Sequence, residues 1–418
     1  MTQRTQKRTI KFPPYLLQRI LKPYVRLALN LVFRRIFVFG KAKIPTTGPV
    51  LLVGNHQCAL IDSLMVHCMI HRRPFFLARA DIFKKPFIAK LLRQLRMLPI
   101  FRIRDGYDQL AKNEAIFEQV AALLKAGETI AIYPEGNHHH ERRIRPLKKG
   151  AARILMAYHE IADTPITLIP YGIHYEDHYA FRSRVRLTFG DPITYDDLLG
   201  LEQKAFQKSI LGRIRDSLEG LTIHYNLRDQ MTEKELLRQQ ELHRLDQNWP
   251  VKDHFPAEKA FSRQLEQLQQ EAPNTFNQQV EALATIQALD GQQQRGLLLQ
   301  NAFKRNLSLG PIHWLLMFLL FLAYVFTLPI YGLGSWICQQ VALRMTRDPM
   351  FFTTMWFATS IIIFPILLIL TMSLLAVFDF FLPGMLFLGF WTIVLLRLDF
   401  VFPGFIPNRF PVGEPRLY

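Results

Sequence analysis

Acidic residues are missing from the first part of the chain. No aspartate or glutamate precedes Asp62, and the same stretch is rich in basic residues. These are Arg4, Lys7, Arg8, Lys11, Arg19, Lys22, Arg26, Arg34, Arg35, Lys41 and Lys43. The 418-residue chain has a formal net charge of +17, which favours an acidic partner such as nucleic acid, an anionic membrane or a phosphorylated molecule. Because no zinc-finger, RNA-binding or basic-zipper pattern occurs, we expect no nucleic-acid partner.

Cysteine is also scarce. The chain has three cysteines, Cys58, Cys68 and Cys338, and none forms a CxxC pair. This pattern excludes a disulfide framework and indicates reduced thiols in a catalytic part that faces the cytoplasm. The N-terminus lacks the compact apolar segment and small-residue cleavage site of a secretory signal peptide.

Two common catalytic patterns are absent as well. The chain has no G-x-S-x-G elbow, which argues against a serine nucleophile. Nothing near Cys58 marks it as an activated thiol, so we expect it to be a small buried residue. The run His138-His139-His140 invites a metal interpretation, but adjacent side chains cannot easily share one ion. We therefore expect neither a metal nor another cofactor.

Five segments are distinguishable along the chain. Residues 1–44 contain a basic amphipathic helix, predicted over 12–38, that suits the surface of an anionic membrane or, alternatively, packs on the core. Residues 45–225 form an α/β domain, 226–305 a helical spacer, 306–405 a membrane domain, and 406–418 a tail. The apolar runs 312–338 and 350–401 have room for two to three transmembrane helices, which places the protein in a membrane as an integral component.

Strand and helix patterns alternate in the α/β segment. Short apolar runs predict strands at 49–55, 74–80, 97–103, 129–133, 166–171 and 185–189. Helical spacing predicts helices at 61–71, 86–95, 107–125 and 149–159. This alternation indicates an α/β fold with a mostly parallel sheet, followed by a helical region and C-terminal transmembrane helices.

A histidine and an aspartate follow the first predicted strand of this domain. His56 comes directly after the strand, and Asp62 lies near the start of the next helix. Ligands bind beyond the carboxyl ends of strands in open α/β sheets, and a histidine oriented by a carboxylate can deprotonate a hydroxyl there. The alternative is structural: His56 is then an ordinary turn residue and Asp62 a helix cap.

Further candidate residues follow other strands. Arg102 and Arg104, spaced to share one strand face, suit a phosphate group, although they equally suit a solvated face. Glu135 after the strand at 129–133 is able to orient a hydroxyl, and Gly136 allows close approach of the backbone to a ligand. Lys148 belongs to a basic run, Arg142 to Lys149, that suits carrier phosphates or lipid headgroups.

In order along the chain, these blocks resemble those of the glycerolphosphate acyltransferase family, which includes lysophosphatidic acid acyltransferases. Asn55-His56…Asp62 resembles the catalytic dyad block, Ile100-Phe101-Arg102-Ile103-Arg104 the acceptor-phosphate block, and Tyr133-Pro134-Glu135-Gly136 the Phe-Pro-Glu-Gly block with Tyr133 replacing the first residue. Ile169-Pro170 resembles a fourth block, a strand that ends in proline.

Two departures from the common pattern indicate a branch of that family. Five residues separate His56 from Asp62 instead of four, and the third block continues into histidines rather than Thr-Arg-Ser. Both features resemble the branch that acylates glycerol-3-phosphate or dihydroxyacetone phosphate, in which His139 matches a usual histidine.

The resemblance implies catalysis by His56 and Asp62, with Arg102, Arg104, Glu135, Gly136, His139 and Lys148 binding substrates. The implied co-substrates are a glycerol-phosphate acceptor and an acyl thioester donor, either acyl-coenzyme A or acyl carrier protein. Two alternatives remain open at this point: lysophosphatidic acid as acceptor, and a non-catalytic lipid-binding scaffold that keeps the fold.

Overall fold

The computed structural model describes residues 16–102, 112–139, 141–178, 183–226, 230–248, 253–287, 333–334, 336–345 and 349–377. Some predicted features lie outside these ranges. They are Arg104, most of the first apolar run and the end of the second.

A seven-stranded sheet forms the centre of the molecule, in the order β1-β7-β6-β2-β5-β3-β4. Its strands are β1 (Arg35–Phe39), β2 (Val50–Gly54), β3 (Phe75–Arg79), β4 (Met97–Ile100), β5 (Thr129–Ile132), β6 (Thr167–Tyr175) and β7 (Arg184–Phe189). Neighbouring strands pair in parallel except for β6 and β7, which pair antiparallel. The predicted α/β fold with a mostly parallel sheet is therefore confirmed.

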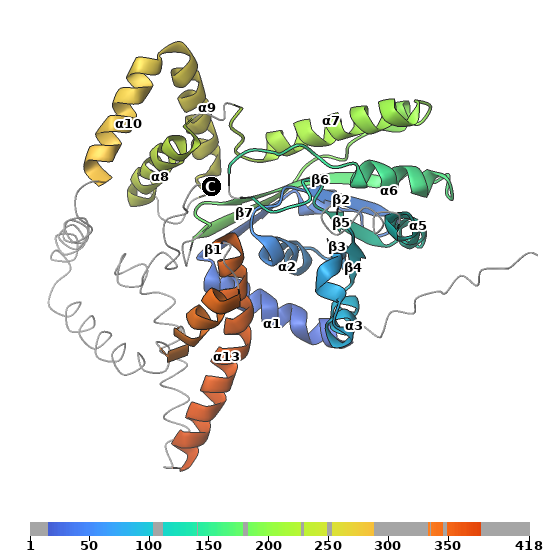
Figure 1. The fold of residues 1–418 in the computed structure, drawn as a ribbon, viewed down its shortest axis with the longest axis horizontal. Helices are drawn as coiled ribbons and strands as arrows, with labels where there is room; N and C mark the ends of the chain where they lie inside the picture. Colours follow the sequence, from blue (N-terminus) through green and yellow to red (C-terminus); the bar gives the residue numbers. More distant parts are fainter. Residues whose placement is uncertain are drawn as a thin grey trace, which may run out of the picture.

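Helices cover both faces of this sheet (Figure 1). One face packs against α5 (Lys112–Lys125), α6 (Gly150–His159) and α7 (Gln203–Leu221). The other packs against α1 (Leu16–Val32), α2 (Ala59–Met69) and α13 (Pro349–Val377). Strand β2 contributes side chains to both faces. Leu51 and Val53 pack in the apolar core on the side of α5, α6 and α7, whereas Val50 and Leu52 pack in the core on the side of α1, α2 and α13. Because both faces are covered, its strand reads as one continuous apolar run.

The N-terminal helix is shorter than the sequence predicts. Helix α1 ends at Val32, and residues 35–39 form the edge strand β1 instead of continuing the helix to residue 38. Strand β1 pairs with β7, beginning with Arg35 opposite Arg184. This pairing partner is distant in sequence, so helical spacing could not reveal it, and the sheet begins before residue 45.

Two other strand predictions need correction. Strand β6 does not end at residue 171, nor at the proline of the fourth block, but continues to Tyr175, with Pro170 paired to Val53 of β2. Strand β4 ends at Ile100, so Arg102 lies beyond the strand rather than on its face. The predicted helix 86–95 corresponds to α3 (Pro86–Gln94).

Helices α8 (Met231–Asn248), α9 (Phe255–Glu271) and α10 (Pro273–Gln287) form a group beside β6 and β7 (Figure 1). The predicted helical character of this region is confirmed. Buried ion pairs join α8 and α9 to the sheet: Glu258 of α9 contacts Arg238 of α8 and lies 3.4 Å from His174 of β6. These helices therefore pack directly against the α/β domain.

Among the described residues, one helix is long and apolar enough to cross a membrane. This is α13, in which Thr354–Thr371 has a mean hydropathy of 2.1. Its first half packs against α2, burying Trp356 and Phe357, whereas Ile366 and Ile369 farther along are exposed. Helix α13 extends away from the sheet at this second end (Figure 1).

Candidate active site

The His56 and Asp62 side chains meet at the carboxyl end of β2. His56 follows this strand, and Asp62 lies in the first turn of α2. The His56 Nδ1 atom is 2.8 Å from Asp62 Oδ2, and the Asp62 side chain is fully buried. The predicted pairing of a histidine with an orienting carboxylate is thus present in the structure.

The Asp62 carboxylate also fixes the loop that carries His56. Its Oδ2 atom accepts hydrogen bonds from the backbone N–H groups of Gln57 and Cys58, both at 2.8 Å. Its Oδ1 atom accepts a 2.7 Å bond from the Tyr175 hydroxyl. Asp62 therefore serves both as a loop anchor and as the partner of His56.

The His56 ring is held by packing as well. It stacks on the Tyr133 ring with centroids 4.1 Å apart and planes inclined by 12°, and the His138 ring approaches edge-on at 5.8 Å. The His56 side chain is 16% exposed. Because Nδ1 faces Asp62, the tautomer with hydrogen on Nδ1 leaves Nε2 as a base for a ligand's proton.

Glu135 connects the second sequence block to the first. It follows β5, the neighbour of β2 in the sheet, and its Oε1 accepts a 2.9 Å bond from the His56 backbone N–H. Its Oε2 accepts a 3.2 Å bond from the Arg145 backbone N–H. Burial raises the pKa of Glu135, and these two N–H groups oppose that rise. Glu135 therefore holds two loops together at the candidate site.

The loop after Glu135 brings His139 to the same place. The His139 backbone N–H donates to the His56 carbonyl at 3.0 Å, and its Nε2 lies 3.2 Å from Glu141 Oε1. Gly136 has φ of +78°, which a side chain would strain. An added Cβ there would meet the Lys148 side chain at 3.4 Å.

A small pocket opens beside this cluster. It is lined by Asn55, His56, Gln57, Glu135, His139, Glu141, Arg143, Ile144, Thr222 and Ile223. The structure thus brings His56, Glu135 and His139 together around one cavity. Lys148 is exposed next to Gly136, and Arg102 lies outside the lining with its Nη2 atom 3.6 Å from Asp81.

Sequence reasoning missed several residues of the site. Tyr175 was not predicted as a partner of Asp62 because β6 was expected to end before it. The signal is its spacing: Tyr175 lies two residues after buried Ile173, so in a continuing strand both side chains point to the same face of the sheet. Thr222 and Ile223 follow α7, and no pattern in the sequence marks them.

Comparison with known proteins agrees with this geometry. Residues 35–174 match the family model described as acyltransferase, and the candidate site lies within this matched segment.

Relatives include proteins of two activities. The chain is 31% identical over 199 residues to "Glycerol-3-phosphate O-acyltransferase 2" of Saccharomyces cerevisiae, a match that spans 44% of this chain and 25% of the yeast protein. It is 25% identical over 138 residues to the 1-acyl-sn-glycerol-3-phosphate acyltransferase of Borreliella burgdorferi, spanning 33% of this chain and 52% of that protein. The matches therefore cover about half or less of these relatives' own lengths and do not favour one branch.

A solved structure is also similar to part of the chain. The crystal structure of the 1-acyl-sn-glycerophosphate acyltransferase of Thermotoga maritima matches with a TM-score of 0.36 and 19% identity. That match covers 49% of this chain and 79% of the other.

Proposed function

We propose that this protein is an O-acyltransferase that moves a fatty acyl group from a thioester carrier to a glycerol-phosphate hydroxyl. The observation that carries the proposal is the 2.8 Å contact of His56 with buried Asp62 beside a pocket, within an acyltransferase-family domain. Glycerol-3-phosphate or dihydroxyacetone phosphate is the proposed acceptor, and acyl-coenzyme A or acyl carrier protein the donor. The similarity to a yeast glycerol-3-phosphate O-acyltransferase supports glycerol-3-phosphate as the acceptor.

In the proposed reaction, His56 Nε2 takes the proton from the acceptor hydroxyl as its oxygen attacks the thioester carbonyl. The C–S bond then breaks, and the imidazolium returns its proton to the leaving thiolate. Asp62 stabilises the imidazolium and keeps hydrogen on Nδ1. Because the acceptor supplies the nucleophile, no covalent enzyme intermediate is formed.

Other residues are proposed to bind the substrates around this centre. Arg102, Arg104 and Lys148 supply positive charge for phosphate groups, while Glu135 and His139 shape the acceptor pocket. Arg104 lies outside the described residues. Gly136 lets the backbone approach the ligand closely.

A membrane setting is part of the proposal, as an integral protein whose catalytic domain faces the cytoplasm. It rests on α13, with its apolar exposed end, and on α1, whose exposed face carries Arg19, Arg26 and Leu27.

Washing membranes with alkaline carbonate should leave the protein in the pellet, and its release into the supernatant would contradict an integral anchor.

A second candidate acceptor is lysophosphatidic acid, favoured by the similarity to the Borreliella acyltransferase. Membranes containing the protein should be offered labelled acyl-coenzyme A with glycerol-3-phosphate, dihydroxyacetone phosphate or 1-acylglycerol-3-phosphate, in parallel with membranes containing His56→Ala. Transfer to either of the first two supports the first candidate, and a preference for the third supports the second. Absence of transfer to every acceptor, also with acyl carrier protein, would refute the proposed activity.

A further inference from the structure

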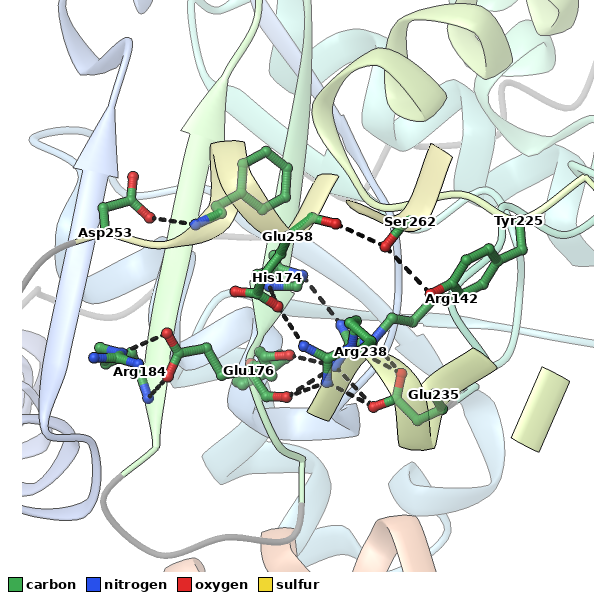
Figure 2. A network of polar contacts seen from close by, with 12 residues as sticks. Arg142, His174, Glu176, Arg184, Tyr225, Glu235, Arg238, Asp253, Glu258 and Ser262 are labelled. Carbon is green, nitrogen blue, oxygen red and sulfur yellow. Dashed lines mark hydrogen bonds and ion pairs between the residues drawn. The ribbon is translucent and has the colours of Figure 1, made fainter. Parts of the chain in front are cut away.

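Two consecutive arginines, Arg142 and Arg143, differ in what their side chains face. The Arg142 side chain is only 2% exposed and points into a polar network between the sheet and helices α8 and α9, which Figure 2 shows from close by. Arg143 lines the candidate active-site pocket and is 16% exposed. Their different surroundings suggest different tasks.

Arg142 anchors the loop that forms one wall of the pocket. Its Nε donates a 2.8 Å bond to Glu235 of α8, and its Nη2 donates to the carbonyls of Tyr175 at 2.8 Å and Glu176 at 3.0 Å. The Arg142 carbonyl accepts a 2.8 Å bond from the Tyr225 N–H. Both ends of this residue are therefore tied to neighbouring elements.

The residues that Arg142 contacts are themselves joined by further hydrogen bonds and ion pairs. Arg238 of α8 is fully buried, donates to Glu235 and to the Glu176 carbonyl at 2.6 Å each, and pairs with Glu258 of α9 (Figure 2). Further along the loop, the Ile144 N–H donates to His224 Nδ1 at 2.8 Å. A loop fixed on both sides of Arg143 limits the positions that its guanidinium can take.

The Arg143 guanidinium is held from one edge. Among the described residues, its hydrogen-bonding partner is the Glu141 carboxylate, at Nε. Glu141 in turn lies 3.2 Å from His139. Contact at Nε fixes the planar group while both terminal NH₂ groups remain able to donate to a ligand, and such a fork matches the oxygens of a phosphate.

We propose that Arg143 is a phosphate-binding residue of this pocket, positioned by the Arg142 anchor in the α8–α9 network. The proposal rests on the acyltransferase function and deepens it. Among the residues lining the pocket, Arg143 supplies the guanidinium, whereas Arg102 lies outside the lining. The phosphate group belongs either to the acceptor or to the thioester donor, and both offer the same oxygen chemistry.

Kinetics of the full-length protein in membranes test the proposal and identify the source of the phosphate. Each substrate is varied while the other is saturating, for wild type, Arg143→Ala, Arg143→Lys and Arg213→Ala. Arg213 is a matched control because it is an arginine paired with a carboxylate, Asp197, away from the pocket. We expect Arg143→Ala to raise KM for one substrate by about 10- to 100-fold, Arg143→Lys to raise it less, and Arg213→Ala to leave it unchanged.

The substrate whose KM rises is the one that Arg143 binds. Unchanged KM values for both substrates in Arg143→Ala would overturn the proposal, as would an equal effect of Arg213→Ala. A binding measurement, which needs no acyl transfer, distinguishes failure of the proposed Arg143 role from failure of the proposed acyltransferase activity. Isothermal titration of the detergent-solubilised full chain with glycerol-3-phosphate and with coenzyme A should show weaker binding of one of them to Arg143→Ala, whether or not acyl transfer is detected. Equal affinities of wild type and variant for both probes would also refute the role of Arg143.

Discussion

At the scale of single residues, the Asp62 carboxylate joins several parts of the site. It contacts His56 Nδ1, two backbone N–H groups and the Tyr175 hydroxyl. A carboxylate can accept all these bonds, whereas an amide turns one of its atoms into a donor. The chemistry of the site therefore requires the aspartate and not merely a side chain of its size.

Asp62→Asn should lower kcat by roughly 100- to 10,000-fold, because the amide disfavours the required His56 tautomer and cannot stabilise the imidazolium. Steady-state kinetics on membranes would measure this, with Asp191→Asn as control. Asp191 is an exposed aspartate that pairs with Lys43 on the surface, 2.8 Å away. Near-normal turnover of Asp62→Asn would exclude the proposed dyad.

Tyr175→Phe should lower stability by about 1–3 kcal/mol and reduce kcat as well, because it removes the hydroxyl that donates to buried Asp62. Tyr195→Phe is a useful comparison, since its hydroxyl is also bonded inside the protein, to His159 at 3.1 Å, but on the other face of the sheet. Thermal unfolding and kinetics should show lower stability for both variants and lower kcat for Tyr175→Phe alone. If Tyr175→Phe keeps the kcat of the wild type, Tyr175 has only a structural role.

At the scale of elements, helices α8 and α9 are joined to β6 by charged groups that water does not reach. Glu258 is 1% exposed and Arg238 is fully buried. Burial acts to raise the pKa of Glu258, yet His174 and Arg238 hold it below its ordinary value. A buried charge depends on its partners, and Arg238 has two of them, Glu258 and Glu235.

Glu258→Ala should destabilise the protein by about 1–3 kcal/mol, because His174 and Arg238 lose a shared buried partner while Arg238 keeps its pairing with Glu235. Glu271→Ala, an exposed glutamate at the end of the same helix, should change stability little. Denaturant unfolding followed by circular dichroism would compare them. Similar midpoints for the two variants would show that the network does not hold α9 to the sheet.

Most helices and strands of the α/β domain followed from local patterns, but β1 did not. Residues 35–39 continue a stretch of apolar and basic residues whose helical spacing is strong up to Val32. Their strand conformation depends on β7, about 150 residues away in the chain. Such pairing decides the outcome where local propensity is weak.

At the scale of the whole molecule, stability should depend on pH through a partly buried histidine, His67. Burial, with the charges of Lys22, Arg96 and Arg73, lowers the pKa of His67 from 6.5 to about 4. Between these values the unfolded chain binds a proton that the folded protein does not. Stability is therefore complete above pH 6.5 and falls as the pH is lowered toward 4.

His67→Gln should make the unfolding free energy less sensitive to pH in this window, by up to about 3 kcal/mol between pH 7 and 4. Unfolding of detergent-solubilised wild type and variant across this range would test it. A matched control is His71→Gln, which changes an exposed histidine just beyond the same helix. Parallel curves of unfolding free energy against pH for His67→Gln and wild type would contradict the lowered pKa of His67 in the folded protein.

Patterns in the sequence were sufficient to predict the α/β class, the order of the blocks and the candidates His56, Asp62, Glu135 and Gly136. These features are local: apolar runs make buried strands, and polar residues at their ends recur in order along the chain. Gly136 illustrates this, because its φ of +78° is a property of one residue.

The contacts between distant residues depend on the folded arrangement of the chain. It placed Tyr175 against Asp62, carried Arg143, Thr222 and Ile223 to the pocket, and packed α8 and α9 behind Arg142. These residues lie far apart in the chain, so no local spacing signals their contact. Their positions follow from the sheet order, in which β5 and β6 flank β2, and from burial of charges that are stable only when paired.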